Sequence, residues 1–405
     1  MPETMFVWGN YPMTSNSDGF YGHWVIDLMK RGMKVVCIDP KVTWLSCRAE
    51  EHLRVRPGTD AALALGMLNA VINEELYDKE FVEKWTYGFD QLKERVQEYP
   101  VEKVAEITWI PAEKIRKAAR ILAASKPATM QWGLAVDMTK ESLPASQAIA
   151  ALFQITGNVD IPGGIIAPPE ILNYAGGWGR ELISDEQKAK RIGLDKYLLL
   201  QFGFQIAHPD TLIETLETAK PYKLHGAWIQ TSNPISCMSA DPQRTYRNLM
   251  GLDFIACVDL FMTPTIMAVA DVVLPAATFP ERDGIRVGDG CQRGEVINKV
   301  TQIGECKSDI NPITLEKLSI KDGDWVWVEN QRGRAKRRVQ ATPVIDPRMC
   351  ACDHAWWLPE GDPEKLYHVF DLNINNLVPW IPGKSGFGSN YKTMLVKLYK
   401  VKEGE

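Results

Sequence analysis

The 405-residue sequence has no uninterrupted apolar run long enough to cross a membrane. A membrane-spanning helix needs about 20 consecutive apolar residues, and the strongest candidate, residues 266–274, is interrupted by Asp271. The first residues, Met1-Pro2-Glu3-Thr4, carry neither the basic start nor the apolar segment of a signal peptide. We therefore expect a cytoplasmic chain without a direct membrane span.

The usual metal-binding patterns of cysteine and histidine are also missing. The eight cysteines are scattered, no C-x2-C pair occurs, and the only close pair is Cys350-Ala351-Cys352. The six histidines show no H-x3-H or H-E-x2-H spacing. Zinc and iron–sulfur sites are built from such closely spaced ligands. We expect no metal site made of protein side chains, and we expect most cysteines to be ordinary buried thiols.

An excess of basic charge is absent as well. Lys and Arg total 46 against 51 Asp and Glu, for a net charge of −5, so a nucleic-acid partner is not expected. With 45% hydrophobic and 24% charged residues, the composition is that of a folded globular protein rather than a disordered one. The length suits about two to three packing units.

What the sequence does contain begins with a strand–helix–strand pattern. Phe6-Val7-Trp8 is a short apolar run that ends at the turn Gly9-Asn10-Tyr11-Pro12, and a helical stretch follows as far as Gly32. The next apolar run, residues 35–38, ends at Asp39. Two strands joined by a crossover helix run in parallel, so this segment predicts a parallel sheet covered by helices.

The same pattern occurs a second time. The apolar run 227–230 is followed by Thr231-Ser232-Asn233-Pro234, a helix is predicted near 243–250, and the strand 254–258 ends at Asp259. The separation from Asn233 to Asp259 is 26 positions, against 29 from Asn10 to Asp39. Such spacing is typical of the mononucleotide-binding half of a doubly wound sheet.

Each copy offers groups that a nucleotide needs. The loop after the first strand presents backbone N–H groups to phosphate. The acid after the second strand can accept hydrogen bonds from a ribose or from the N1–H and N2–H2 edge of guanine. Neither copy has the G-x-G-x-x-G pattern of common NAD sites. One such turn is also compatible with a simple loop, whereas two matched copies favour two nucleotide-bearing ligands bound in a pseudo-symmetric way.

The C-terminal part changes character. Trp325-Val326-Trp327-Val328 alternates after the turn at 322–324, which predicts short strands. The predicted fold class is α/β, with doubly wound parallel-sheet domains related by a pseudo-two-fold repeat, plus a C-terminal β-barrel. The expected domains are a first dinucleotide-binding α/β domain with a helical region at 1–165, a second dinucleotide-binding α/β domain at 166–310, and the barrel at 311–405.

Several longer motifs carry a resemblance to a known family. The runs Ile38-Asp39-Pro40-Lys41, 53–60 (LRVRPGTD), 156–164 (TGNVDIPGG), 259–265 (DLFMTPT) and 270–275 (ADVVLP) occur in this order. Together they resemble the molybdopterin oxidoreductases of the dimethyl sulfoxide reductase family, and 58–106 is most similar to its acetylene-hydratase-like members. The tail around 320–324, 356–360 and 375–377 resembles the family's dinucleotide-binding, double-psi-like barrel. The resemblance covers nearly the whole chain.

The resemblance implies a molybdenum or tungsten bis(molybdopterin guanine dinucleotide) cofactor, which agrees with the two copies of the nucleotide pattern. It identifies no catalytic residue and no metal ligand in this sequence. By match of motif it implies that the cofactor-binding residues are Gly9, Asn10, Asp39, Gly58, Thr59 and Asp60 for one dinucleotide, Ser232, Asn233, Asp259, Thr263 and Asp271 for the other, and Trp357, Asn375 and Lys392 in the tail.

The sequence also departs from the family's pattern. Members usually begin with an iron–sulfur module whose Cys cluster holds a [4Fe-4S] centre, followed by a Ser, Cys, selenocysteine or Asp metal ligand. Both would lie before Phe6, and a second expected segment is missing near 309–311. We expect an oxidoreductase or hydratase of anaerobic metabolism, acting on a small-molecule substrate with a possible iron–sulfur electron-transfer subunit. The alternative is a truncated, non-catalytic family remnant with a structural or assembly role.

Overall fold

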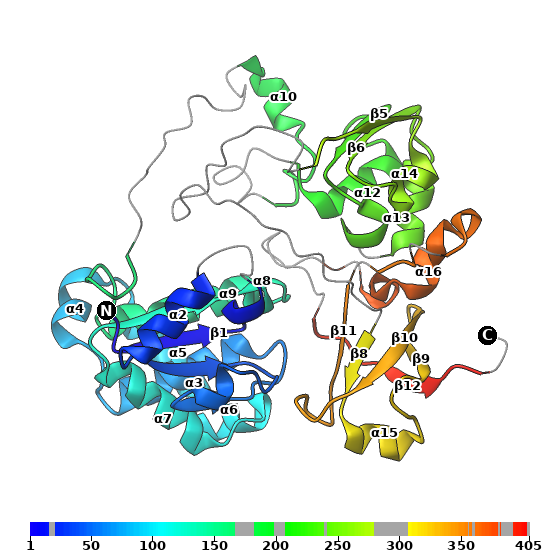
Figure 1. The fold of residues 1–405 in the computed structure, drawn as a ribbon. Coiled ribbons are helices and arrows are strands. Elements are labelled where there is room, and N and C mark those ends of the chain that lie inside the picture. The colour runs from blue at the N-terminus through cyan, green and yellow to red at the C-terminus, as the bar shows by residue number, and fades with distance from the viewer. Residues whose placement is uncertain are drawn as a thin grey trace. The chain divides into compact units, whose positions relative to one another are not determined.

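The computed structural model describes residues 1–15, 21–166, 182–197, 207–238, 241–278, 307–354, 356–358, 361–379, 381 and 392–402. Within these ranges no helix is both long and apolar enough to cross a membrane. The chain divides into two compact units (Figure 1). The first unit is Met1–Leu172 with Arg286–Thr301 and Phe387–Thr393, and the second is Asn173–Ile285 with Gln302–Gly386 and Met394–Glu405.

The first unit is built on a parallel sheet in the order β3-β2-β1-β4. Its strands are β1 (Thr4–Trp8), β2 (Lys34–Ile38), β3 (Glu51–Leu53) and β4 (Ala128–Trp132). The helices are α1 (Pro12–Ser15), α2 (Tyr21–Lys30), α3 (Asp60–Asn73), α4 (Lys79–Trp85), α5 (Phe89–Arg95), α6 (Val101–Thr108), α7 (Ala112–Ala124), α8 (Leu134–Asp137) and α9 (Ser142–Ile155), with the 3-10 turns η1 (Ser46–Arg48) and η2 (Val96–Glu98).

Alternation along the strands divides this sheet between two cores. Phe6 and Trp8 of β1 pack into a large cluster beneath α3, α7 and α9, whereas Met5 and Val7 pack with Val25 of α2 on the opposite face. Side chains two residues apart on a strand share a face, so each strand feeds both layers. Open sheets with helices on both faces usually bind ligands at the carboxyl ends of their strands.

The second unit contains a smaller parallel sheet in the order β5-β6-β7. Its strands are β5 (Gly226–Gln230), β6 (Phe254–Asp259) and β7 (Val272–Pro275). The accompanying helices are α10 (Asp185–Ala189), α12 (Pro209–Thr218), the π-helical turn η4 (Pro234–Met238), α13 (Pro242–Leu249) and α14 (Pro264–Val269). Proline at the first turn starts α12, α13 and α14, where its missing N–H costs no helical hydrogen bond.

The same unit holds a mixed five-stranded sheet in the order β11-β8-β10-β9-β12. Its strands are β8 (Lys307–Ile310), β9 (Trp325–Glu329), β10 (Arg334–Ala341), β11 (Cys350–Cys352) and β12 (Lys397–Lys400). The helical segments are α15 (Pro312–Leu318), η6 (Pro363–His368), α16 (Val369–Leu372) and η7 (Ile374–Leu377). A buried guanidinium, that of Arg337 on β10, donates to the carbonyl oxygen of Asp353 at 2.6 Å.

The predicted α/β architecture with parallel sheets and a β-rich C-terminal part is confirmed. Asp78 caps α4 by accepting from the N–H of Phe81 at 2.9 Å. The strands β3, β4 and β7 were not expected from the sequence patterns. Because β8 pairs with β10 and β11, the C-terminal sheet begins before residue 311. The division into three domains stays a prediction.

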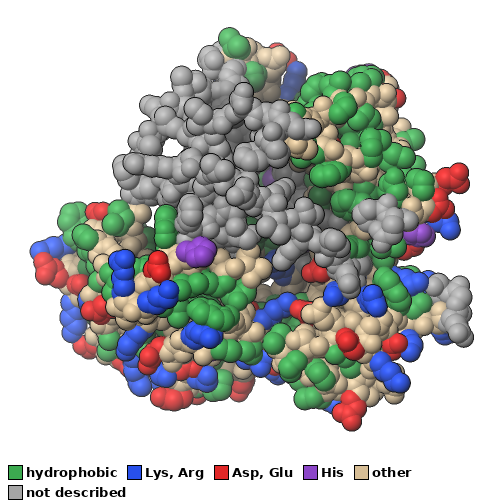
Figure 2. All heavy atoms as spheres, viewed as in Figure 1, with side chains coloured by type: hydrophobic (Ala, Val, Ile, Leu, Met, Phe, Trp, Pro, Cys, Tyr) green, Lys and Arg blue, Asp and Glu red, His purple; other side chains and the backbone are tan. Residues whose placement is uncertain are grey.

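The cysteines differ from expectation. Among the described ones, Cys37 and Cys257 are buried, whereas Cys47 and Cys237 are exposed and Cys350 and Cys352 are half-buried. Cys291 and Cys306 lie outside the described residues. Most of the described thiols are therefore not ordinary core residues. On the face shown in Figure 2, acidic and basic side chains are interspersed, in keeping with the nearly balanced charge totals.

Candidate functional site

The carboxyl edge of the first sheet is shaped by two glycines. Gly9 follows β1 with φ +59°, and its N–H donates to the carbonyl of Ile38 at 2.8 Å. Gly133 follows β4, and a Cβ built on it would lie 2.7 Å from the Gly9 carbonyl oxygen. The strand order changes direction between β1 and β4, the position where open α/β sheets bind ligands. Because neither glycine has a side chain, the backbone is exposed to a ligand at this point of the edge.

Asp39 follows β2 on the same edge. Its Oδ1 accepts from the N–H of Lys41 at 2.8 Å, and its carbonyl oxygen lies 2.9 Å from Nε2 of His52. Burial raises the pKa of Asp39 to about 6, and the charges of Lys41 and Lys392 oppose the rise. Burial also lowers the pKa of Lys392. A desolvated carboxylate that feels the charges of two lysines is suited to a ligand that carries both hydrogen-bond donors and phosphate.

The predicted residues 58–60 play three different parts. A Cβ at Gly58 would lie 2.2 Å from Cγ2 of Thr393, so glycine lets the tail approach this turn. The Thr59 hydroxyl donates to the Arg56 carbonyl at 2.7 Å. Asp60 is buried and its Oδ1 accepts from Nε1 of Trp8 at 2.8 Å. Asp60 therefore anchors α3 to β1, and its carboxylate faces the core rather than the edge.

The second sheet repeats the backbone turn of the first. Thr231 follows β5 with φ +51°, and its N–H donates to the carbonyl of Val258 at 3.1 Å. Val258 precedes Asp259 as Ile38 precedes Asp39, so Thr231 corresponds to Gly9. By this register Ser232, not Asn233, is the counterpart of Asn10. The spacing in the sequence suggests that Asn10 corresponds to Asn233, because both residues are asparagine. The backbone hydrogen bonds show a different correspondence.

Two buried polar groups lie just after this turn. Oδ1 of Asn233 accepts from the Thr265 hydroxyl at 2.5 Å, whereas Nδ2 of Asn233 has no hydrogen-bond partner among the described residues. The hydroxyl of Ser236, fully buried in η4, is likewise without a partner in the described part of the chain. Burying such groups unpaired costs about 1–3 kcal/mol each. A donor and a hydroxyl of this kind suit a polar ligand at this edge.

The remaining predicted residues of the second sheet separate into two edges. Oδ1 of Asp259, half-buried at the carboxyl edge, accepts from the N–H groups of Leu260 at 2.6 Å and Phe261 at 3.3 Å. Thr263 caps α14. Asp271 precedes β7 at the amino edge, where its Oδ2 accepts from the N–H of Ile255 at 2.7 Å. The structure therefore does not bring Asp271 together with Asp259.

The tail residues are held in different surroundings. Trp357 packs against the hydrophobic core beside β5 and β6, and Asn375 is buried in η7. Its neighbour Asn373, fully buried, donates from Nδ2 to the carbonyls of Ile235 and Ser236, at 3.1 Å each. Asn373 thus braces the turn that carries Ser236. Ser236 and Asn373 were not predicted from the sequence, because no sequence pattern indicates a π-helical turn.

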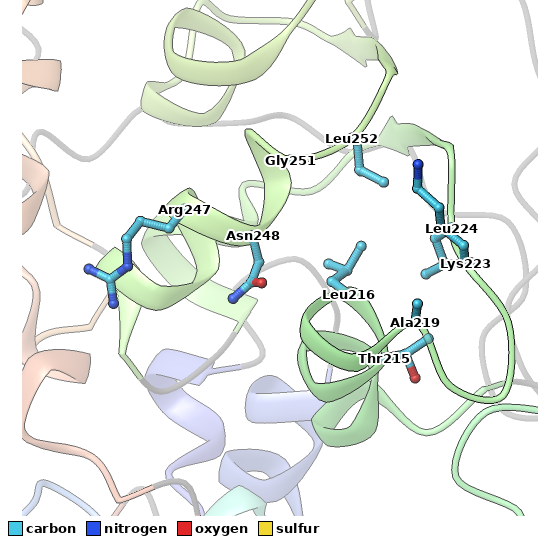
Figure 3. A pocket seen from close by; sticks show the side chains of 9 residues that line it. All are labelled: Thr215, Leu216, Ala219, Lys223, Leu224, Arg247, Asn248, Gly251 and Leu252. Carbon is cyan, nitrogen blue, oxygen red and sulfur yellow. The ribbon is translucent and has the colours of Figure 1, made fainter.

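A pocket of about 160 Å³ lies away from these edges (Figure 3). It is lined by Leu216 and Ala219 at the end of α12, Lys223 before β5, and Asn248 and Leu252 around the end of α13. These residues lie at the amino ends of β5 and β6, so the pocket is on the opposite edge from Asp259. Among the described residues no three His, Cys, Asp or Glu side chains cluster as a metal site.

Comparison with known proteins identifies two matching families. The family described as "Molybdopterin oxidoreductase" matches residues 7–313. The one described as "Molydopterin dinucleotide binding domain" matches residues 292–395. The two matches together span most of the chain and include both sheet edges described above.

The chain is also similar to curated proteins and to a solved structure. Acetylene hydratase of Syntrophotalea acetylenica is 36% identical over 307 residues, covering 69% of this chain and 42% of that protein. Formate dehydrogenase H of Escherichia coli is 28% identical over 298 residues, covering 70% and 40%. The chain thus spans less than half the length of these relatives. The structure of acetylene hydratase from Pelobacter acetylenicus has a TM-score of 0.87 at 24% identity, covering 99% of this chain and 78% of that one, and so shares the fold.

Proposed function

Since the chain belongs to the molybdopterin oxidoreductase family, we propose that it binds two molybdopterin guanine dinucleotides as part of a molybdenum or tungsten enzyme. The substrate of that enzyme is proposed to be a small molecule. The observation that carries the proposal is the repeated turn: Gly9 and Thr231 each leave a parallel strand with positive φ and donate to the residue before an aspartate. Each sheet therefore offers one nucleotide half-site.

In the first half-site, Asp39 is proposed to accept hydrogen bonds from the guanosine end. Its raised pKa of about 6 leaves it largely ionised at neutral pH, and ligand N–H donors would replace the water that burial has removed. Gly9 and Asn10 are proposed to lie beside the phosphates with Lys392, because a point charge suits phosphate oxygens and glycine lets the backbone approach a ligand closely. The Gly9 N–H itself is bonded to the Ile38 carbonyl. Gly58 and Thr59 are proposed to belong to the same half-site, because a Cβ at Gly58 would meet Thr393, the neighbour of Lys392.

In the second half-site, the buried groups support the fit. The Asn233 Nδ2 donor and the Ser236 hydroxyl lack partners among the described residues, and both match the amide-rich edges of a pterin or guanine. Ser232 and Asp259 are proposed to complete this half-site, with Thr263, Trp357 and Asn375 supporting its walls. Bound cofactor would supply the metal-centred redox, atom-transfer or water-activation chemistry. The role of the chain is to orient the cofactor and exclude water from it.

Two finer proposals follow from the relatives. We propose that the C-terminal sheet forms part of a double-psi-like barrel, supported by the dinucleotide-binding match at 292–395. We also propose an electron-transfer partner, because relatives from Methanocaldococcus jannaschii and Salmonella typhimurium are named as subunits of F420-dependent formate dehydrogenase and thiosulfate reductase. Copurification with a second subunit that contains iron would support this proposal. A single-subunit preparation that turns over substrate would contradict it.

The test of the main proposal is chemical. The protein is purified from molybdenum- or tungsten-replete anaerobic cells, treated with acid, and assayed for released guanine nucleotide and for both metals. We expect guanine nucleotide together with one of the two metals, and the metal ratio decides between molybdenum and tungsten. Protein that contains neither would support the alternative of a non-catalytic remnant.

A further inference from the structure

The five-stranded sheet carries two cysteines on an edge strand. Cys350 and Cys352 are the two ends of β11, whose one pairing partner among the described strands is β8. Residues two apart on a strand point to the same face, and the two thiols are hydrogen-bonded to each other. Both are half-buried rather than sealed in the core. The chain thus presents a dithiol at a sheet edge.

The surroundings make the two sulfurs unequal. Ser308 lies opposite Cys352 in the β8–β11 register and its Oγ donates to the Cys352 Sγ at 2.9 Å. Arg337 on β10 adds a buried positive charge on the same side, and Asp353 acts in the opposite direction. The hydrogen bonds from Cys350 and Ser308, with the Arg337 charge, lower the pKa of Cys352 to about 7. The bond to Cys352 and burial raise the pKa of Cys350 well above its ordinary value.

We propose that Cys350 and Cys352 form a redox-active dithiol that exchanges with low-molecular-weight disulfides, with Cys352 as the attacking thiolate and Cys350 as the resolving thiol. The Cys352 sulfur attacks one sulfur of RS–SR, an S–S bond to Cys352 forms, and RS⁻ leaves. Cys350 then loses its proton and attacks Cys352 Sγ, which releases the second RS group. Two electrons pass from the dithiol to the disulfide, yielding a Cys350–Cys352 disulfide and two thiol products.

The geometry also indicates that this disulfide is readily reversed. Residues two apart on a regular strand are about 6.6–6.8 Å apart at Cα, the upper end of the range that disulfides span. Strained disulfides are more easily reduced and are typically the labile ones.

The first experiment maps the oxidation product. The purified protein is equilibrated anaerobically with graded ratios of reduced and oxidised glutathione, remaining thiols are alkylated in acid, and peptides are identified by mass spectrometry. We expect a disulfide between Cys350 and Cys352 in the wild type and glutathione trapped on Cys352 in Cys350→Ser. The proposal would be overturned if both thiols stayed reduced at the most oxidising ratio. It would also be overturned if Cys350 in Cys352→Ser trapped glutathione as fast as Cys352 does in Cys350→Ser.

The second experiment needs no cysteine variant. Alkylation of Cys352 by iodoacetamide is followed against pH, with exposed Cys47 in the same sample as the internal reference. We expect half-maximal reactivity of Cys352 below the ordinary thiol pKa of 9.0, moved to higher pH by Ser308→Ala and unchanged by Ser146→Ala, whose hydroxyl donates to a helix carbonyl. Cys352 reacting no faster than Cys47 at neutral pH would contradict the assignment. Neither experiment uses a residue of the proposed nucleotide half-sites, so the two proposals fail separately.

Discussion

The two parallel sheets share a backbone turn but differ in the side chains around it. Asp39 is desolvated and feels the charges of Lys41 and Lys392, with one backbone N–H on its carboxylate. Asp259 is braced by two backbone N–H groups, and in its sheet Nδ2 of Asn233 and the Ser236 hydroxyl have no partner among the described residues. Between the two sheets, strand register repeats more faithfully than residue type. We therefore expect binding at the first half-site to depend on charge and binding at the second to depend on buried amide and hydroxyl groups.

The largest effect is expected from Asp39→Asn, because it removes the charge and keeps an oxygen for the Lys41 N–H. Loss of a charge-assisted contact worth about 1.5–3 kcal/mol weakens binding of the first dinucleotide roughly ten- to a hundredfold. Nucleotide content after gel filtration measures this, with Asp195→Ala, an exposed residue in neither sheet, as control. Full retention in Asp39→Asn would break the claim that the first half-site depends on charge.

The same variant should stabilise the cofactor-free protein. Because the folded-state pKa of Asp39 is about 6, above its ordinary 3.8, the protonated form favours folding, and this contribution is lost as pH rises through about 6. Above that pH, Asp39→Asn should raise the free energy of unfolding by roughly 1–3 kcal/mol. The gain should vanish near pH 4. Urea unfolding at the two pH values measures it, and a gain that is equal at both would contradict the burial argument.

A smaller effect is expected from Ser236→Ala in the second half-site. Its hydroxyl has no partner among the described residues, so removal should leave the stability of the cofactor-free protein unchanged or raise it by up to about 1 kcal/mol. Nucleotide retention should fall about fivefold, the value of one neutral hydrogen bond. Thr265→Val is the contrast, because it breaks the bond to Asn233 and should destabilise. A loss of stability in Ser236→Ala like that in Thr265→Val would assign Ser236 to the core.

Comparing Gly58→Ala with Gly32→Ala distinguishes the effect of backbone strain from that of a clash with Thr393. Both positions have positive φ, at +81° and +101°, but a Cβ meets Thr393 at Gly58 and nothing within 4 Å at Gly32. Both variants should lose about 1–2 kcal/mol of stability. Only Gly58→Ala should also lower nucleotide retention, by displacing Lys392 with Thr393. Equal nucleotide retention in the two variants would contradict the claim that Lys392 and Thr393 belong to the first half-site.

The smallest effect is expected from Asp271→Asn. The side chain bonds the Ile255 N–H at the amino edge, and asparagine keeps an oxygen for it. We expect a change of under about 0.5 kcal/mol in stability and unchanged nucleotide content. A nucleotide loss as large as that of Asp39→Asn would return Asp271 to the binding set.

Local sequence patterns predict much of the fold. They predict less of the candidate site. Apolar runs ending in Asp39 and Asp259 predicted β2 and β6. The pattern could not reveal that Asp60 turns inward to Trp8, because strand ends and helix starts both favour aspartate for reasons unrelated to ligands. Ser236 and Asn373 become visible only when chain segments far apart in sequence are brought together by folding.

The most direct test of two half-sites is the number of guanine nucleotides per chain. Protein from metal-replete cells is compared with Asp39→Ala, Asp259→Ala, the double variant and Asp195→Ala, each acid-treated and quantified against protein. We expect two nucleotides in the wild type and in Asp195→Ala, about one in each single variant with the larger loss in Asp39→Ala, and fewest in the double variant. One nucleotide in the wild type, or two in both single variants, would contradict it.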